Sequence, residues 1–300
     1  MRPPSLTPDI ELFLCHHTAE RAPEIAAAIG RVEEIGILAL EYAVDDHDPA
    51  TDPREVVGAT QNDLHRHLLN NEPLDFVHPN GFFAALVGEL AQYDHGIRAV
   101  FMVDVARNTF TAEDVIEVLE NHDETIHNND LRTYAASPAA YILTRALRIA
   151  EAFEWRETVV ADQMTRIVNC LEDYIPAALV MGADHYYISN LLRDRGLDTR
   201  STFVHPPSPT FEVHLSTLLR RRNGEGTLAD TLPEEELGMY GVADMIYYAS
   251  KRNNYPYQIY DFLRSKHLST RALEEIAEAM MCDGTHPIFD DLPYQQDIII

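Results

Sequence analysis

Short apolar runs alternate with amphipathic segments along roughly the first two-thirds of the chain. The runs have the length and composition of buried strands, and the segments between them have the spacing of helices. A strand–helix–strand succession of this kind predicts βαβ units with right-handed crossovers. The predicted strands are residues 10–15, 35–40, 99–104, 177–181 and 202–204.

Helical periodicity accounts for most of the remaining chain, and a proline-rich stretch, residues 205–209, follows the last predicted strand. We therefore predict an α/β fold, with a mixed central sheet flanked by helices and a mostly helical C-terminal extension. The predicted core is residues 1–204, with helical insertions at about 56–95 and 105–172, and the extension is residues 205–300. The predicted helices are about 19–31, 56–70, 79–94, 111–120, 138–172 (as one helix or two), 186–195, 211–221, 233–250, 256–265 and 269–281.

The charge balance excludes several classes of partner. The sequence has 49 acidic and 23 lysine or arginine side chains, a formal net charge of -26, whereas nucleic acids and anionic membranes require basic surfaces. The three cysteines have no CxxC spacing, which predicts reduced thiols. No apolar run reaches the ~20 residues that span a bilayer, and the N-terminus lacks a secretory signal pattern. The composition predicts a cytoplasmic protein that binds neither nucleic acid nor membranes.

Three predicted strands end close to side chains that can bind a metal ion or transfer a proton. His16 and His17 follow the first strand, and Glu41 follows the second. His185 comes three residues after Gly182, where the fourth strand ends and a helix begins. In open α/β sheets, ligands bind where the carboxyl ends of the strands meet. We therefore expect a metal site or an acid–base site at this edge.

Adjacent residues that leave a strand point to opposite sides, so only one of the two histidines can face such a site. We expect it to be His16, with His17 as the alternative. Asp104 closes the third strand and is either a further ligand or a cap for the next segment. Arg156 and Glu157 lie in a predicted helix, where they are either site residues or an ordinary exposed ion pair.

The other candidates also have ordinary structural interpretations. Glu41 can lie just past its strand, in water, although a carboxylate buried there must be paired or bound to a metal. Asp184 can cap the following helix, and His185 is then incidental. The pattern GxxH is weak by itself and gains weight only from its strand–turn–helix context.

The order of these motifs resembles that of the TraB/Tiki-like superfamily, which also takes in erythromycin-esterase-like and ChaN-like proteins. That family has a first strand ending in GxxH, a second strand ending in glutamate, a helical Arg-Asx/Glu-x-x-Met-Ala motif, and a late strand with a second GxxH. The resemblance covers about residues 10–204, and Phe13 and Val160 stand where the family has glycine and methionine. The similar segments are residues 13–16, 38–42, 156–161 and 182–185, together with the acidic strand end at Asp104.

The resemblance implies a hydrolase scaffold whose site contains two histidines and at least one acid. In a metal-dependent version, His16, Glu41 and His185 hold a divalent ion such as zinc, manganese or cobalt, which activates a bound water molecule. His17 and Asp104 are the alternative ligands.

In a metal-free version, a histidine and a glutamate activate water directly. The residues for this role are Glu41, Glu157 and His185. Arg156 then stabilises an oxyanion or orients Glu157. The substrate is a peptide, an ester or a lactone, and the sequence does not choose among them.

Two alternatives to catalysis remain open. The chain can be a non-catalytic binding or regulatory protein that keeps this scaffold, which the phenylalanine in the first motif and the helical extension favour. The helical extension can also build a homodimer.

Overall fold

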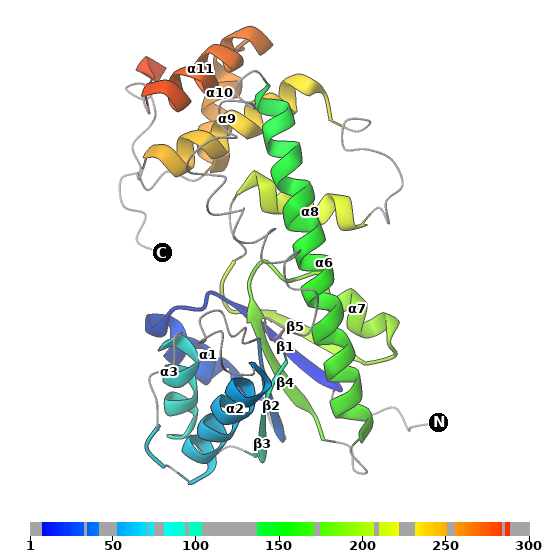
Figure 1. Ribbon diagram of the computed structural model, residues 1–300. Coiled ribbons are helices and arrows are strands. Elements are labelled where there is room, and N and C mark those ends of the chain that lie inside the picture. Colours follow the sequence, from blue (N-terminus) through cyan, green and yellow to red (C-terminus); the bar gives the residue numbers. More distant parts are fainter. Residues whose placement is uncertain are drawn as a thin grey trace. The chain divides into compact units, whose positions relative to one another are not determined.

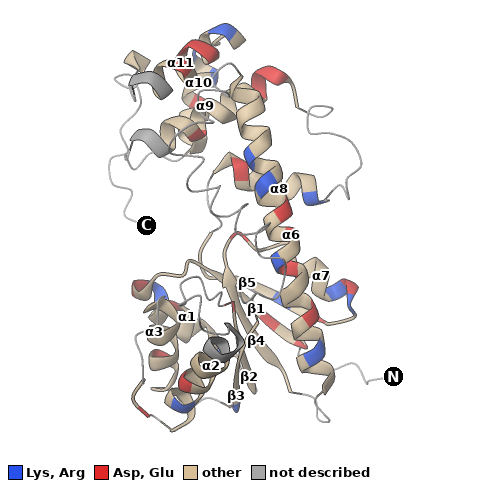
Figure 2. Ribbon diagram, viewed as in Figure 1, with Lys and Arg blue, Asp and Glu red and all other residues tan. Residues whose placement is uncertain are grey.

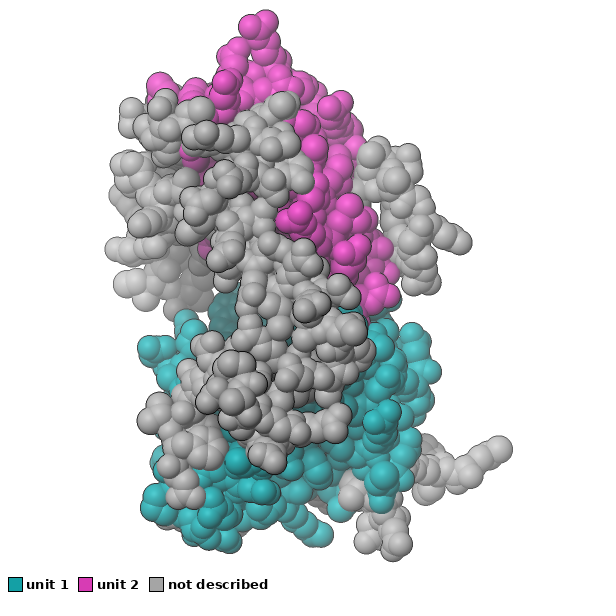
Figure 3. All heavy atoms as spheres, viewed as in Figure 1, with its two compact units in different colours: residues 1–112, 155–207 teal, residues 113–154, 208–300 magenta. Residues whose placement is uncertain are grey.

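The chain divides into two compact units, which we describe separately (Figure 3). Unit 1 contains residues 1–112 and 155–207, and unit 2 contains residues 113–154 and 208–300. The computed structural model describes residues 8–32, 35–41, 53–70, 72–74, 81–93, 96–103, 137–170, 175–206, 210–221, 232–250, 256–283 and 286–288.

Unit 1 is built on a five-stranded sheet with the strand order β3-β2-β4-β1-β5 (Figure 1). Every pairing among these strands is parallel, which corrects the prediction of a mixed sheet. The reason is that helices connect the consecutive strands, and a helical crossover returns the chain in its original direction. The strands are β1 (Ile10–Cys15), β2 (Ile37–Leu40), β3 (Ala99–Met102), β4 (Ala177–Gly182) and β5 (Thr199–Phe203).

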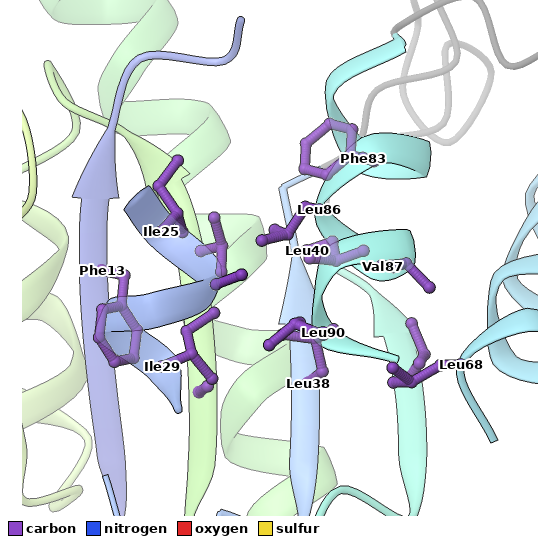
Figure 4. Packing of buried hydrophobic residues seen from close by; sticks show 14 of the residues in the cluster. Phe13, Ile25, Ile29, Leu38, Leu40, Leu68, Phe83, Leu86, Val87 and Leu90 are labelled. Atoms are coloured by element: carbon purple, nitrogen blue, oxygen red, sulfur yellow. The ribbon is translucent and has the colours of Figure 1, made fainter. Parts of the chain in front are cut away.

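One face of the sheet is covered by the helices that follow β1 and β2. These are α1 (Ala22–Ile29), which a short 3-10 turn precedes, α2 (Pro53–Asn70) and α3 (Gly81–Leu90). Alternate strand residues, among them Phe13, Leu38 and Leu40, pack against the apolar sides of these helices (Figure 4). Phe13 is 1% exposed and lies near Ile25 and Ile29 of α1. The phenylalanine of the first motif is therefore a core residue of this face.

The opposite face is covered by the second half of α6 (Pro138–Cys170) and by α7 (Ile188–Asp194). The strand residues that point there, such as Leu12 and Leu179, pack against Val160 and Met164 of α6 and against Leu192 of α7. The unit is thus a three-layer α/β/α arrangement, and the α/β class is confirmed.

Strand β4 has a special place in this topology. Its connection to β5 runs through α7 on one face, whereas the connections leaving both of its neighbours, β1 and β2, run through helices on the other face. Adjacent strands whose connections leave on opposite faces form the switch point where α/β proteins bind ligands. The carboxyl ends of β2, β4 and β1 therefore mark the place to search for a site.

Unit 2 is helical where it is described. The first half of α6 packs with α8 (Phe211–Arg221), α9 (Glu234–Ser250), α10 (Pro256–Ser265) and α11 (Thr270–Asp283). Their shared core includes Ile142, Phe211, Ile246 and Leu263. Among the described residues of both units, the charged side chains lie mainly on helices (Figure 2). The described strands, all in unit 1, contain only Glu11 and Arg200, which pair with each other.

Helix α6 is one continuous helix of 33 residues. The sequence predicts helix over 138–172 but leaves open whether it forms one helix or two. No helix in the described ranges is long and apolar enough to cross a membrane. The predicted helix at 111–120 lies outside the described residues, as does Asp104.

Candidate functional site

Three distant chain segments bring charged side chains together at the carboxyl end of the sheet. β2 ends at Leu40 and is followed by Glu41, while β4 ends at Gly182 and is followed by His185. Because alternate residues of a strand point to the same face, Glu41 is directed toward α6. Glu157 of α6 meets it there through His185.

Helix α6 places Glu157 by its periodicity. The buried stripe of this helix recurs at intervals of three and four residues, and Glu157 continues it one turn toward the N-terminus. The apolar residues of the stripe pack on the sheet, whereas Glu157 lies beside the carboxyl ends of the strands. Its apolar members are Val160, Ala161, Met164 and Val168.

His185 lies between two carboxylates. Its Nε2 is 3.1 Å from Glu41 Oε1, and its Nδ1 is 3.1 Å from Glu157 Oε1. Arg156 Nη2 donates to Glu41 Oε1 at 2.6 Å, and the Gly182 backbone N–H donates to Glu41 Oε2 at 2.6 Å. All four predicted catalytic residues, Arg156, Glu157, His185 and Glu41, thus belong to one network.

Burial and charge together set the protonation states. Glu157 is 0% exposed, His185 4% and Glu41 5%, while the Arg156 side chain is 19% exposed. Burial disfavours ionised Glu41, but the positive charges of His185 and Arg156 outweigh it and hold the pKa of Glu41 well below its usual range. Burial likewise disfavours protonated His185, but the two carboxylates outweigh it and raise the pKa of His185 to about 9.

At neutral pH, the site therefore contains two negative and two positive charges. His185 is an imidazolium that donates one hydrogen bond to each carboxylate. In this state it can give a proton but cannot accept one, and Glu41 is ionised but weakly basic. Arg156 is the member that solvent reaches most easily.

The donor atoms of this network do not fit a metal ion as they are arranged. Both ring nitrogens of His185 face carboxylates, and Arg156 supplies the cation that neutralises Glu41. Within the described ranges, no group of three His, Cys, Asp or Glu side chains is arranged to hold a metal. The metal-dependent version stays a prediction, and no step is derived through a metal below.

His16, the histidine that we expected at the site, does not contact this network. The chain turns directly after β1, where the Thr18 N–H bonds to the His16 carbonyl at 3.0 Å, so strand alternation no longer directs the side chain. The exposed His16 ring instead stacks on His205, with centroids 5.3 Å apart. Its Nε2 lies 2.8 Å from the Pro206 carbonyl oxygen.

His17, the alternative, is nearer to the network. Its ring stacks on Phe82 at 4.8 Å and meets the edge of Phe83 at 5.1 Å, and its charge contributes to the low pKa of Glu41. His17 is only partly buried. It is thus the histidine of the adjacent pair that influences Glu41.

Cys15, the last residue of β1, does not provide a nucleophile. Its thiol is buried and lies 3.7 Å from the Met181 carbonyl oxygen. Burial, and after it the negative charge of Glu41, raises the pKa of this thiol far above its usual range. A thiolate is therefore not available there at neutral pH.

Sequence reasoning missed a second buried polar cluster, which lies in unit 2. Arg145 of α6 pairs with Glu212 of α8, and the Asp244 carboxylate of α9 accepts from the backbone N–H groups of Phe211 and Glu212 at 3.1 and 3.0 Å. The available signal was a carboxylate inside the apolar run Val242-Ala243-Asp244-Met245-Ile246. A charge in such a run needs a buried partner.

Comparison with known proteins adds no further constraint. No family model matches the chain, and neither a curated protein nor a solved structure is significantly similar to it.

Proposed function

We propose that unit 1 is a hydrolase in which Glu41, His185 and Glu157 move protons during the addition of water to a carbonyl group. One observation carries this proposal: a buried histidine is held between two carboxylates at the switch point of a parallel sheet. Burying charges costs stability, and such perturbed groups concentrate at functional sites. The resemblance to esterase-like and protease-like proteins supports the same class of reaction.

The proposed mechanism assigns each side chain one role. Glu41 accepts a proton from water, whose oxygen adds to the substrate carbonyl, and Arg156 stabilises the negative charge that develops on the carbonyl oxygen. His185 then donates its Nε2 proton to the leaving group. The proton on Glu41 passes to His185, which restores both groups. Glu157 accepts from Nδ1–H throughout and fixes the orientation of the ring.

A general base must accept a proton, and Glu41 is a weak base in the resting state. The contact with Arg156 explains how it becomes a stronger base when substrate binds. In the resting state, its guanidinium group donates to Glu41 Oε1 and holds the carboxylate ionised. When Arg156 turns toward a substrate carbonyl oxygen, Glu41 loses this hydrogen bond, and its proton affinity rises. Substrate binding therefore activates the base. Peptides, esters and lactones all offer the carbonyl group that this mechanism needs.

The experiment is a hydrolysis screen with the full-length protein on ester, lactone and peptide substrates. The His185→Asn and Glu41→Gln variants are expected to lose about 100-fold or more in kcat/KM. Asp162→Asn is the matched control, because Asp162 is an exposed carboxylate of the same helix, bonded to Arg195. Hydrolysis at equal rates in all variants would remove the proposal. The screen is repeated with added zinc, manganese and cobalt, since metal-dependent turnover would favour the other version.

A non-catalytic binding protein is the second candidate. This candidate is favoured because the carboxylates of Glu41 and Glu157 are already paired with Arg156 and His185. The network therefore needs no charged substrate to neutralise it. The phenylalanine of the first motif no longer supports it, because Phe13 packs into the core on the opposite face. Failure of every substrate class, with the network intact by NMR, would favour this candidate.

The free thiols of Cys15 and Cys170 agree with the proposed cytoplasmic location.

A further inference from the structure

Strand β5 forms one edge of the sheet, because among the described strands it pairs with β1 alone. Hydrogen bonds near its ends show which of its backbone groups face β1. The Ile10 N–H donates to the Asp198 carbonyl oxygen at 3.0 Å. The Val204 N–H donates to the Leu14 carbonyl oxygen at 2.9 Å. Bonded residues alternate along a parallel pair, so the residues of β5 that point outward are Thr199, Ser201 and Phe203.

These outward backbone groups are open to a further strand. Within the described residues, the outward N–H and C=O groups of Ser201 and Phe203 have no hydrogen-bond partner. The Thr199 carbonyl oxygen accepts from the Arg193 side chain at 3.2 Å. Arg193 is exposed, however, and a carbonyl oxygen can accept two hydrogen bonds. An open edge of this kind is a template for pairing with another chain.

The side chains of β5 do not protect this edge. Proteins commonly block an exposed edge with proline, lysine or a bulge. β5 contains neither proline nor lysine, and its register with β1 is unbroken. Its one charged residue, Arg200, is paired with Glu11 of β1. Phe203 is 50% exposed, so a strand added here would also cover apolar area.

We propose that β5 is the interface of a homodimer, in which two copies of this chain pair antiparallel and continue the sheet. A two-fold axis at Ser201 makes the strand its own partner, as a closed dimer requires. Ser201 then faces Ser201 of the second copy, and Thr199 faces Phe203 of the second copy. Residues opposed in this way exchange N–H···O=C bonds, which uses all the outward groups of β5. This interface is independent of the proposed hydrolase activity.

Charge favours a second copy in this register. The chain has a net charge of -26, so two copies repel where acidic surfaces meet, whereas β5 has no acidic residue. Arg200 lies opposite Thr202 of the second copy, so no like charges are directly opposed. A pairing centred on Arg200 would oppose two arginines. A pairing centred on Thr202 would need the His205 N–H, which already lies 3.3 Å from the Leu14 carbonyl oxygen.

The test is analytical ultracentrifugation of the full-length protein over a concentration series, with hydrogen exchange of single amides measured by NMR in the same series. A dimer should form as the concentration rises. The amides of Ser201 and Phe203 should gain protection from exchange in step with it. The amides of Arg200 and Thr202, which bond to β1, should be protected at every concentration and serve as the internal control.

A proline variant tests the backbone pairing. Ser201→Pro removes an N–H that the dimer uses but that β1 does not, and proline is tolerated on an edge strand at such a position. Its dissociation constant should rise by about 10-fold or more, since bonds across the two-fold axis are lost. Ser201→Ala is the matched control, because it keeps the N–H and should stay within about threefold of the unaltered protein.

Two charge variants test the register, and they decide the question even if the proline variant does not fold. Thr202 is exposed and lies opposite Arg200 of the second copy. Thr202→Lys should weaken the dimer and Thr202→Glu should strengthen it, each by about threefold. General repulsion between acidic chains would give the reverse order, which would overturn the proposal. A monomer at every concentration would overturn it as well, as would a dimer in which the Ser201 amide gains no protection.

Discussion

Both units bury charged side chains, but the two clusters differ in their balance. In unit 1, the negative charges of Glu41 and Glu157 are matched by Arg156 and protonated His185. Each charge there has an opposite neighbour within 3.1 Å. The pKa of Glu41 is lowered and the pKa of His185 is raised, and both shifts favour the charged form of the group.

In unit 2, Arg145 is in direct contact with Glu212, while the nearby Asp244 accepts only backbone hydrogen bonds in the contacts described. Burial, and then the negative charge of Glu212, raises the pKa of Asp244 to about 8. The cluster therefore reduces its excess charge by taking up a proton. Similar burial thus gives a balanced ionic network in one unit and a proton-binding group in the other. Among the contacts described, the difference is the number of cations beside the carboxylates, which are Arg156 and His185 in unit 1 and Arg145 in unit 2.

The largest expected effect is the removal of the cation from the unbalanced cluster. Arg145→Met removes the cation that contacts the buried Glu212 carboxylate, which should lower the free energy of unfolding by about 3–5 kcal/mol. Arg156→Met should lower it by only about 1–2 kcal/mol, because solvent and His185 still reach Glu41. Urea unfolding followed by circular dichroism and by the fluorescence of Trp155, the single tryptophan, measures both.

Arg271→Met is the control for these substitutions. Arg271 pairs with Glu275 on the surface and is 86% exposed, so its loss should change the free energy of unfolding by less than about 0.5 kcal/mol. Equal losses for Arg145→Met and Arg156→Met would contradict the difference between the two clusters.

The second expected effect is a pH dependence of stability that falls in different pH ranges for the two units. Asp244 has a folded pKa of about 8 and an ordinary value of 3.8, so the folded state binds more protons between these limits. Stability from this group therefore falls as pH rises from about 4 to 8, by a few kcal/mol. His185, raised to about 9, contributes fully below pH ~6.5 and loses its contribution as pH rises through 9. Glu41, lowered, loses its contribution only as pH falls below ~4.5.

Thermal unfolding between pH 5 and 8 tests this prediction. Asp244→Asn should remove most of the pH dependence over this range, because an amide does not titrate, although it gives up one of the two capping hydrogen bonds. Should the variant keep the full slope, another group must be responsible for it.

The sequence predicted the elements of unit 1 well, because strand and helix periodicity is local. β1 was placed to the residue, and Arg156, Glu157, Glu41 and His185 were singled out before their contacts were known. What periodicity could not give was the strand order. Since β4 lies beside β2, His185 meets Glu41, and since β5 lies on the other side of β1, His16 meets His205 instead. That order depends on long-range packing.

The polar cluster of unit 2 could not be recognised for a related reason. Arg145 and Glu212 lie in amphipathic helices, where charged residues usually face water. Their burial depends on how three helices pack, which no local pattern encodes. Only Asp244, inside an apolar run, carried a signal.

A third, smaller effect concerns the proton affinity of His185. Glu157→Gln keeps an acceptor for Nδ1–H but removes one negative charge, so the pKa of His185 should fall from about 9 by about one unit. One unit corresponds to about 1.4 kcal/mol of interaction with the protonated ring. NMR titration of the ring carbons measures it. An unchanged pKa would mean that Glu41 alone sets the charge of His185.

The smallest expected effect is at Gly182, whose N–H holds Glu41. An added Cβ would lie 3.3 Å from His185 Cδ2 and 3.5 Å from Glu41 Oε2, so Gly182→Ala should cost about 1 kcal/mol as the histidine shifts by a few tenths of an ångström. Gly58→Ala is the matched control, because nothing lies within 4 Å of its added Cβ and alanine favours the helix. If Gly182→Ala shifts the pKa of His185 while Gly58→Ala does not, the network depends on close approach of the β4 backbone. A loss of stability without that shift would assign the cost to the strand end alone, and the network would then tolerate small displacements of its histidine.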